Sequence, residues 1–433
     1  MRLDWISARN FRCFDSQLFK MAEQFNLFIG NNGTGKTAIL DALAIAVGSL
    51  LLWLPAKSRV FKQDDVRVSW HALGETPTLE QQYPVVVTCE GEVADRKATW
   101  ERRLNSAKSR TTRQTTSEIR RIATEMSDQV MNGESVTLPV VSYYGTGRLW
   151  NQKRRTGVGK RRLATEKPGS RWRGYQDGLN PASDEKRVLA WFKTQEMAAI
   201  QEERSIAALE AVRAAVLTCV DNATRVRFGV QRDQLMVTVG NEDLPLHLLS
   251  DGYHSMVAMI ADIAIRAATL NPHLGERAAL ETPGVVLIDE LDLHLHPKWQ
   301  RRVVEDLMSA FPKIQFFATT HSPFIIQSLR DSEKVRLHNL DNEQAVDSVG
   351  RSVEEITEEI QGVKDVQRSK RHADMIEAAK QYYGVLQGEK KASEAEVAQL
   401  KTKLDELAEP FSDDPAFVAF LNMKRAAAGV AGE

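Results

Sequence analysis

A glycine-rich loop near the N-terminus carries the strongest chemical signal in the sequence. The pattern G-x-x-x-x-G-K-[ST] is matched by eight consecutive residues, Gly30, Asn31, Asn32, Gly33, Thr34, Gly35, Lys36 and Thr37. The glycines allow backbone N–H groups to curl around a phosphate, and the start of a following helix adds positive potential. Lys36 would then reach the β- and γ-phosphates of ATP, and the Thr37 hydroxyl would bind Mg²⁺. The loop therefore predicts a site for ATP with Mg²⁺.

Two adjacent carboxylates supply a second half for such a site. Asp289 and Glu290 follow the apolar run Val285–Ile288, and open α/β sheets bind ligands at the carboxyl ends of their strands. Asp289 is predicted to hold Mg²⁺, directly or through water. Glu290 is predicted to act as the general base that polarises a water for attack on the γ-phosphate.

The elements around these residues predict an α/β fold of the P-loop NTPase class, with a mixed sheet around the loop. Phe25–Ile29 is an apolar strand before the loop, and a helical pattern runs from Thr37 to about Leu52. Val285–Ile288 is typical of a central parallel strand, and Gln315–Thr319 predicts another. A helix is expected over Asp251–Thr269.

Two further segments complete a recognisable set. Leu249-Ser250-Asp251-Gly252-Tyr253 opens the predicted helix, and His321 follows the strand that ends at Thr319. With the loop and the carboxylates, in this order and spacing, they resemble the ABC-type ATPases, although Asp251 and Tyr253 replace the usual Gly and Gln of the signature.

The resemblance implies roles for these residues. In that family the signature Ser and second Gly, matched by Ser250 and Gly252, contact the γ-phosphate of ATP held by a second copy. The switch His, matched by His321, senses the same phosphate, and Asp292 falls at the D-loop. A homo-oligomer, at least a head-to-head dimer, is therefore expected.

Within the superfamily, residues 1–330 resemble the SMC/RecF/OLD-like branch. The opening ISARNFRCF, with Arg12 in the usual basic place, matches that branch. FRCF, LPVVSYYGTGRLW, LSDGYHSM and LIDELDLHLHPKWQ are similar to stand-alone AAA-type ATPases of bacterial defence islands, the PtuA type of Septu and retron-associated systems. Such proteins act with a separate HNH-type nuclease, and the resemblance implies that partner. The Q-loop glutamine stays open among Gln63, Gln152 and the turn Tyr144–Arg148.

The segment Arg148–Arg173 is strongly basic, with ten Lys/Arg against Glu166 and with Trp150 and Trp172 interleaved. One interpretation is contact with DNA or RNA, in which the cations neutralise phosphates and the rings stack on bases. The other is a solvated insertion that docks on a partner or a second protomer. Reversal of the charge at four arginines would distinguish these two interpretations; the four are Arg154, Arg155, Arg161 and Arg162.

Composition limits the class of protein. The 433 residues carry 57 Lys+Arg against 58 Asp+Glu and are 42% hydrophobic, as expected for a globular protein. The longest apolar stretch, Ala42–Leu54, is too short for a membrane span. Cys13, Cys89 and Cys219 match no metal-ligand spacing, and a cytoplasmic location is expected. His294-Leu295-His296 is interpreted as a loop rather than a metal pair.

Domain organisation and three functions follow as hypotheses. Residues 1–350 are expected to form the ATPase head, with a β-rich lobe at 55–136 and a basic, helical insertion at 148–225; residues 351–433 are expected to be helical and to contact a partner or another copy. The first function is a defence ATPase that senses a signal and controls a separate nuclease. The alternatives are a RecF/SMC-like repair ATPase that clamps DNA, and an ATP-gated scaffold with incidental turnover. No nuclease is expected in this chain.

Overall fold

The computed structural model describes residues 1–73, 76–112, 114–148, 170–181, 185–330, 332–342, 350–363, 370–386, 394–408 and 423. The chain forms two compact units, Met1–Gly350 and Arg351–Glu433. Each unit has its own internal packing and is described separately.

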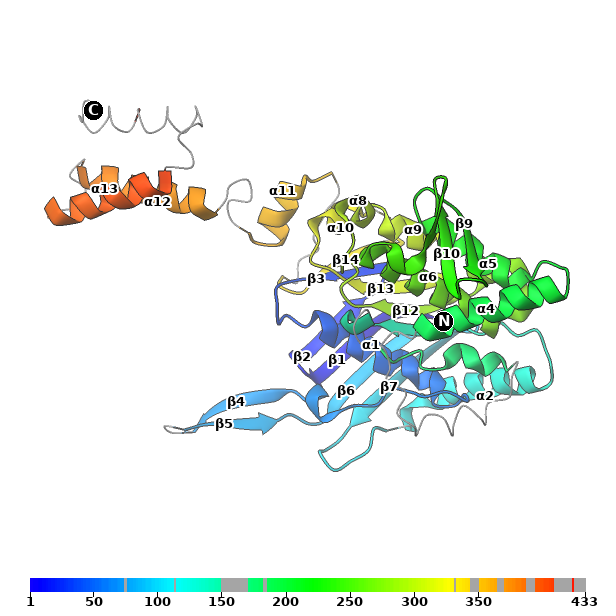
Figure 1. The fold of residues 1–433 in the computed structure, drawn as a ribbon. Helices are drawn as coiled ribbons and strands as arrows, with labels where there is room; N and C mark the ends of the chain where they lie inside the picture. Colours follow the sequence, from blue (N-terminus) through cyan, green and yellow to red (C-terminus); the bar gives the residue numbers. More distant parts are fainter. Residues whose placement is uncertain are drawn as a thin grey trace. The chain divides into compact units, whose positions relative to one another are not determined.

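A parallel five-stranded sheet forms the centre of the first unit (Figure 1). All of its strand pairs are parallel, whereas the sequence predicted a mixed sheet; the antiparallel strands lie in a separate sheet. The predicted α/β class is confirmed, and so is the internal position of the strand that ends at Ile288. In sheet order the strands are β14 (Val335–Asn339), β3 (Phe25–Ile29), β13 (Ile314–Thr319), β12 (Gly284–Ile288) and β8 (Val140–Tyr144).

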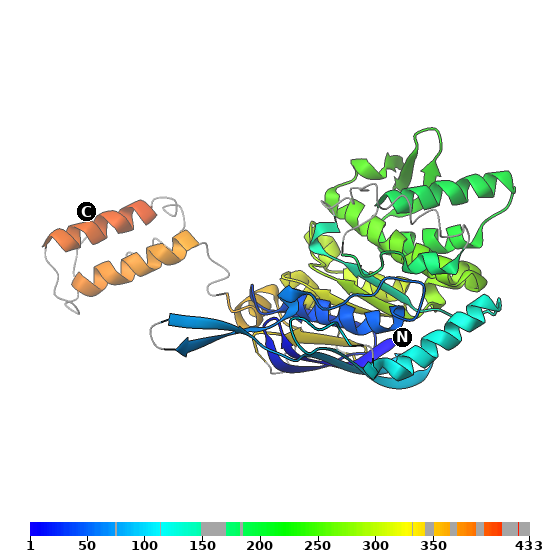
Figure 2. The ribbon, with the colours of Figure 1, turned by 90° about the horizontal axis from the view of Figure 1, so that it is seen from below.

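The helix that follows the glycine-rich loop lies between two sheets. Helix α1 (Lys36–Leu51) contacts β12 and β13 on one side and strands of the antiparallel sheet on the other (Figures 1 and 2). Every residue from Ala38 to Leu51 is buried, as expected for a helix that is almost entirely apolar, and Asp41 is the one charged residue in this range. The Trp100 indole N–H donates to the Ala46 carbonyl at 2.9 Å. In sheet order the antiparallel strands are β2 (Phe14–Lys20), β1 (Arg2–Phe11), β6 (Val85–Val93) and β7 (Arg96–Leu104).

The segment 55–136 contributes to three parts of the unit. Strands β6 and β7 complete the antiparallel sheet that β1 and β2 begin, and β4 (Val68–Leu73) with β5 (Thr76–Gln81) forms a hairpin that extends away from it (Figures 1 and 2). Helix α2 (Ser117–Met131) was missed by the sequence analysis, which expected a β-rich lobe over 55–136. Its buried residues are Ile119, Ile122, Ala123 and Met126.

The other described helices of the first unit cover the parallel sheet or lie in the connections between its strands, and a small antiparallel sheet accompanies them. Two of these helices, at residues 185–201 and 207–219, lie within the insertion that the sequence predicted to be helical. The helices are α4 (Glu185–Gln201), α5 (Ala207–Cys219), α6 (Asp251–Leu270), α7 (Ala278–Glu281), α8 (Pro297–Gln300), α9 (Val303–Ala310) and α10 (Pro323–Ser328). The small sheet contains β9 (Ala223–Gly229), β10 (Gln234–Val239) and β11 (Glu242–Pro245).

The second unit is helical in its described residues. Its elements are α11 (Val353–Glu355), a π-helical turn at Ile356–Ile360, α12 (Lys370–Leu386) and α13 (Glu394–Ala408). Helices α12 and α13 bury a small core of Met375, Ala378, Ala379, Tyr383 and Leu404. None of the described helices of either unit has the length and apolar character that crossing a membrane requires.

Edge strand β14 contributes a histidine whose titration should be measurable. The His338 ring stacks on Phe28, with centroids 4.5 Å apart and planes 15° apart, and its Nε2 lies 3.3 Å from Asn26 Oδ1. Burial lowers the pKa of His338 to about 3. The folded protein therefore keeps this ring neutral in a pH range where the unfolded chain, with a pKa of about 6.5, binds a proton.

The consequence is a pH-dependent stability. The contribution of His338 is fully present above the unfolded pKa and is lost as the pH falls from 6.5 toward 3. Between pH 7.5 and 5.5 the free energy of unfolding should fall by about 1 kcal/mol more in the parent than in His338→Gln. Urea unfolding at both pH values measures this, with His71→Gln on the exposed hairpin as control. An equal fall in the parent and in His338→Gln would contradict the prediction.

Candidate nucleotide-binding site

The glycine-rich loop connects β3 to α1, as the sequence predicts. Gly30, Gly33 and Gly35 have φ values of 149°, 88° and 106°, a range that favours glycine. A Cβ on Gly35 would lie 2.5 Å from the Cys13 sulfur and 2.8 Å from the Phe14 ring. The turn between β1 and β2 therefore packs so closely on the loop that only glycine fits at position 35.

Lys36 lies in the curve of this loop. Its Nζ donates to the carbonyls of Gly30 at 2.7 Å and Asn31 at 2.8 Å. Burial lowers the pKa of Lys36, and the nearby carboxylates of Asp341 and Asp289 act in the opposite direction. An ammonium group held by two neutral carbonyls can move to a more strongly charged acceptor at little cost, because phosphate oxygens make stronger hydrogen bonds.

Asp289 joins the loop helix to two neighbouring strands. Its Oδ2 accepts from the Thr37 hydroxyl at 3.0 Å, and its Oδ1 accepts from the Thr319 hydroxyl at 2.7 Å. Asp289 is 4% exposed. Two oxygens that bind one Mg²⁺ at 2.0–2.1 Å in octahedral geometry lie about 2.9 Å apart. The oxygens of Thr37 and Asp289 therefore fit a magnesium site.

The chain turns sharply after Asp289. Glu290 has a φ of 50°, and its N–H donates to the Thr319 hydroxyl at 2.7 Å. Asp292 Oδ1 accepts from the Thr320 hydroxyl at 2.5 Å and from the His321 N–H at 3.3 Å. The structure thus brings the segment after β12 together with His321, because β12 and β13 are parallel neighbours whose carboxyl ends meet.

The two signature residues at the start of α6, Ser250 and Gly252, differ in their exposure to solvent. Ser250 is exposed at the N-cap, and its hydroxyl does not cap the helix. Gly252 is buried, and a Cβ there would lie 2.2 Å from the His294 carbonyl oxygen. Gly252 therefore allows the helix to pack directly on the backbone of the loop that follows Glu290. His294–His296 is a loop, as predicted.

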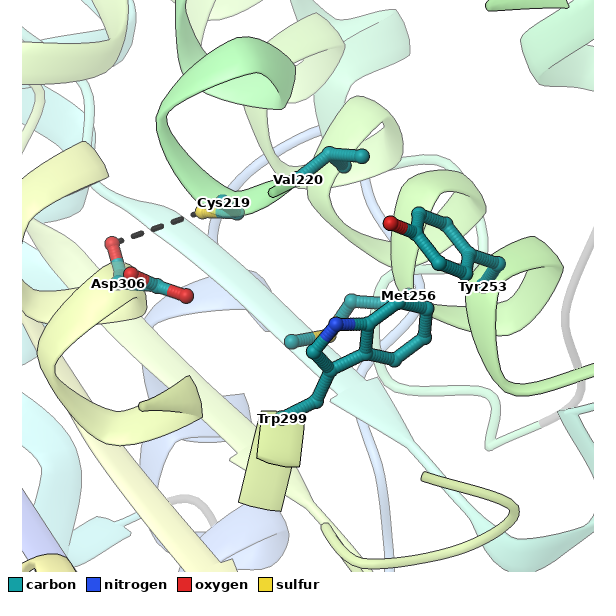
Figure 3. Close-up of a pocket in the computed structure, with 6 residues that line it drawn as sticks. All are labelled: Cys219, Val220, Tyr253, Met256, Trp299 and Asp306. Atoms are coloured by element: carbon teal, nitrogen blue, oxygen red, sulfur yellow. Dashed lines mark hydrogen bonds between the residues drawn. The ribbon is translucent and has the colours of Figure 1, made fainter. Parts of the chain in front are cut away.

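Tyr253, which departs from the signature pattern, has a structural partner. Its ring meets Trp299 of α8 edge-on, with centroids 3.6 Å apart and planes 78° apart. Both rings line a small pocket together with Cys219, Val220, Met256 and Asp306 (Figure 3). Its volume of about 10 Å³ is room for about one water molecule. The aromatic pair therefore fixes the signature helix against α8 rather than forming a ligand site.

Substitution of Gly252 should measure this contact. Gly252→Ala must displace either the helix or the His294 carbonyl, so we expect the free energy of unfolding to fall by about 2 kcal/mol. Urea unfolding is the measurement. Asp251→Ala, an exposed acid in the same turn, is the control and should cost about 0.5 kcal/mol or less. A Gly252→Ala protein as stable as the parent would contradict the packing argument.

The basic residue of the opening segment is neutralised within the fold. Arg12 donates to Asp65 Oδ1 from Nε and Nη2 at 2.9 and 2.8 Å, and also pairs with Asp41 of α1. Arg59 binds the other oxygen of Asp41 at 2.7 Å. Burial raises the pKa of Asp41. Arg12 is thus a member of an ion network beside α1.

The structure locates two of the three Q-loop candidates. Gln63 is exposed beside the Arg12–Asp65 pair. The turn that begins at Tyr144 lies next to Asp289, whose N–H donates to the Tyr144 carbonyl at 2.8 Å. Gln152 lies outside the described residues.

The basic run is described only at its ends. Arg154, Arg155, Arg161, Arg162 and Trp150 lie outside the described residues. At the C-terminal end, Arg171 donates to the Leu270 carbonyl at 2.7 Å, and Trp172 stacks on Tyr175 with centroids 6.2 Å apart. Arg171 and Trp172 therefore contact the fold itself.

Three residues near the loop were missed by the sequence analysis. Thr319 and Thr320 hold Asp289 and Asp292, and their position after a buried strand was the available signal. Asp341 accepts from the Asn31 N–H at 2.8 Å. No local sequence pattern could predict the role of Asp341, because its hydrogen bond with Asn31 joins residues 310 positions apart.

Comparison with known proteins agrees with this geometry. A family model described as "AAA domain" matches residues 6–216. A second, described as "AAA domain, putative AbiEii toxin, Type IV TA system", matches residues 227–327. The two matches together contain the phosphate loop, Asp289 and His321. The fold is that of a P-loop ATPase, as the sequence predicted.

Three named relatives show which kinds of protein this chain resembles. It is 24% identical over 396 residues to "Retron Vc95 probable ATPase" of Vibrio cholerae serotype O1 biovar El Tor, covering 78% of this chain and 74% of the relative. It is 24% identical to "Retron Ec83 probable ATPase" of Escherichia coli, covering 78% and 71%. It is 40% identical over 119 residues to "Septu protein PtuA" of Bacillus mycoides (strain KBAB4), covering 27% and 16%. The resemblance to ATPases of retron and Septu defence systems is confirmed.

Solved structures also match this ATPase. "SMC head domain from Thermotoga maritima" aligns with a TM-score of 0.42 at 15% identity, covering 78% of this chain and 94% of the other.

Proposed function

We propose that this ATPase is the sensor or regulator subunit of an anti-phage defence system and controls a separate nuclease of the HNH type. The relatives named as retron and Septu proteins support this placement. The nuclease partner is proposed on the basis of the family resemblance. ATP hydrolysis is the chemistry that couples the sensed signal to the partner.

ATP binds at the phosphate loop, Gly30–Thr37. The glycine turns and the start of α1 direct backbone N–H groups at the phosphates, and Lys36 moves from the Gly30 and Asn31 carbonyls to the β- and γ-phosphates. Mg²⁺, held by Thr37 and Asp289, neutralises charge on the phosphates when bound. The hydrogen-bonded chain Thr37–Asp289–Thr319 is the single observation that supports this site most strongly.

Hydrolysis uses Glu290 and His321. Glu290 follows directly on the magnesium-holding carboxylate and takes a proton from the attacking water. His321 lies next in space, because its backbone N–H is held by Asp292, and it senses the γ-phosphate. The chemistry is mainly positioning and charge stabilisation.

A second copy completes the site. Ser250 has an exposed hydroxyl that leaves its own helix uncapped, so it can serve the γ-phosphate bound by another protomer. Gly252 supports this by holding the start of α6 against the His294 carbonyl. The active form is therefore at least a head-to-head dimer, and the helical second unit offers a surface for the nuclease or for another copy.

Co-purification with the product of the adjacent gene tests the functional proposal. The expected result is a complex with an HNH-type protein whose nuclease activity differs with and without ATP. A complex with a DNA-clamp loader or replication factor, or a nuclease partner indifferent to ATP, would contradict it. Parallel measurement of phosphate release tests the ATPase part separately.

A further inference from the structure

The end of strand β14 meets the phosphate loop. Strands β14 and β3 are parallel neighbours, with Asn339 opposite Ile29. The residues that follow the two strands therefore lie side by side at the carboxyl ends of the strands. The Leu340 N–H donates to the Ile29 carbonyl at 2.9 Å, which continues the pairing beyond the strand. The Asn339 side chain then accepts from the Asp341 N–H at 2.9 Å, a local contact that turns the backbone.

This turn aims Asp341 at the first peptide of the loop. Asp341 Oδ2 accepts from the Asn31 N–H at 2.8 Å. A Cβ on Gly30 would lie 3.3 Å from the Leu340 Cβ and 3.4 Å from Asp341 Oδ2. The segment Leu340–Asp341 therefore packs against the beginning of the loop as well as bonding to it.

Asn31 of the loop is also held through its carbonyl group. The Asn31 carbonyl accepts from Lys36 Nζ at 2.8 Å and from the Thr34 hydroxyl at 3.0 Å. Asn31 is thus fixed by Asp341 through its N–H and by Lys36 and Thr34 through its carbonyl. When ATP takes the Lys36 ammonium group, the carbonyl loses its charged donor, and the bond from Asn31 to Asp341 remains.

We propose that Asp341 is a positioning residue of the ATP site, which keeps the Gly30–Asn31 turn in the shape that ATP requires. The inference rests on the proposed function, since it assumes that this loop binds ATP. A carboxylate near a triphosphate also repels it through space. Removal of the Asp341 carboxylate therefore has two opposite effects on ATP binding. Loss of the hydrogen bond to Asn31 weakens binding, whereas loss of the repulsion strengthens it.

Two substitutions of Asp341 separate these effects. Asp341→Ala removes the acceptor and the charge, and we expect the Kd and KM for ATP to rise about 10-fold, the effect of losing one hydrogen bond to a charged group. Because the chemistry lies at Glu290, kcat should stay within about twofold of the parent. Asp341→Asn keeps an oxygen acceptor and should restore the Kd to within about threefold of the parent. Glu333→Ala, an exposed acid just before β14, is the matched control and should leave the Kd unchanged.

Titration calorimetry with ATP and steady-state kinetics on the full chain give these values, and circular dichroism checks folding. Asp341→Ala binding ATP as tightly as the parent, or more tightly, would overturn the inference while the proposed function stands. Equal weakening in Asp341→Ala and Asp341→Asn would overturn the hydrogen-bond role. If Asp341→Ala does not fold, Asp341→Asn decides: near-parent affinity supports the inference and a 10-fold loss overturns it. A parent that does not bind ATP would overturn the proposed function and this inference together.

Discussion

Replacing Glu290 with glutamine is expected to lower the rate of ATP hydrolysis by about 10²–10⁴-fold, the contribution typical of a general base. The substitution keeps the size of the side chain and removes its negative charge and its ability to accept a proton. Asp289, Thr37 and the phosphate loop are unchanged, so ATP should still bind. Because hydrolysis no longer removes the γ-phosphate, the ATP-bound dimer should accumulate.

Two measurements check this prediction. Phosphate release gives the loss of rate, and size-exclusion chromatography with ATP, ADP and no nucleotide gives the assembly state. Glu305→Gln on α9, which loses only a surface ion pair with Arg330, is the control. Hydrolysis at the parental rate by Glu290→Gln would refute the assignment of the base.

Replacing Lys36 with alanine should weaken ATP binding by about 100-fold. The ammonium group makes charge-assisted hydrogen bonds to phosphate, each worth about 1.5–3 kcal/mol, and no other described lysine lies in the loop. The effect should be on affinity as well as turnover, in contrast to Glu290→Gln. The pair of variants therefore separates binding from chemistry.

Calorimetry with ATP and Mg²⁺ measures the affinity of Lys36→Ala. Lys313→Ala is the matched control, because Lys313 directly precedes β13, at the end of that strand opposite the phosphate loop, and pairs with Glu281. Parental affinity in Lys36→Ala would show that ATP binds elsewhere. Unchanged unfolding curves in both variants would confirm that the loss is local.

The sequence predicted the features that depend on short stretches of chain. The phosphate loop needs glycines at fixed offsets between a strand and a helix, and Asp289-Glu290 follows an apolar strand, so local residue types suffice. The apolar run Val285–Ile288 was predicted to be a central parallel strand, and the structure confirms it as β12, between β13 and β8. The structure confirms the elements around them, and the roles of the side chains stay predictions.

What the sequence did not show depends on contacts between distant segments. The pairing of Asn31 with Asp341 and the packing of Gly252 on His294 join residues that no local pattern relates. The separation of the antiparallel strands into their own sheet likewise follows from tertiary packing. Helix α2 is a different case, since Ile119, Ile122 and Met126 have helical spacing that the polar composition obscured.

The most direct test of the shared site is to mix two inactive variants, Lys36→Ala and Ser250→Arg. If ATP lies between the loop of one copy and Ser250 of another, each mixed dimer contains one complete site. An equimolar mixture should then recover about a quarter of the parental hydrolysis rate, because half of randomly formed dimers are mixed and each has one of two sites intact. No recovery at any ratio, from variants that fold and associate, would contradict the account.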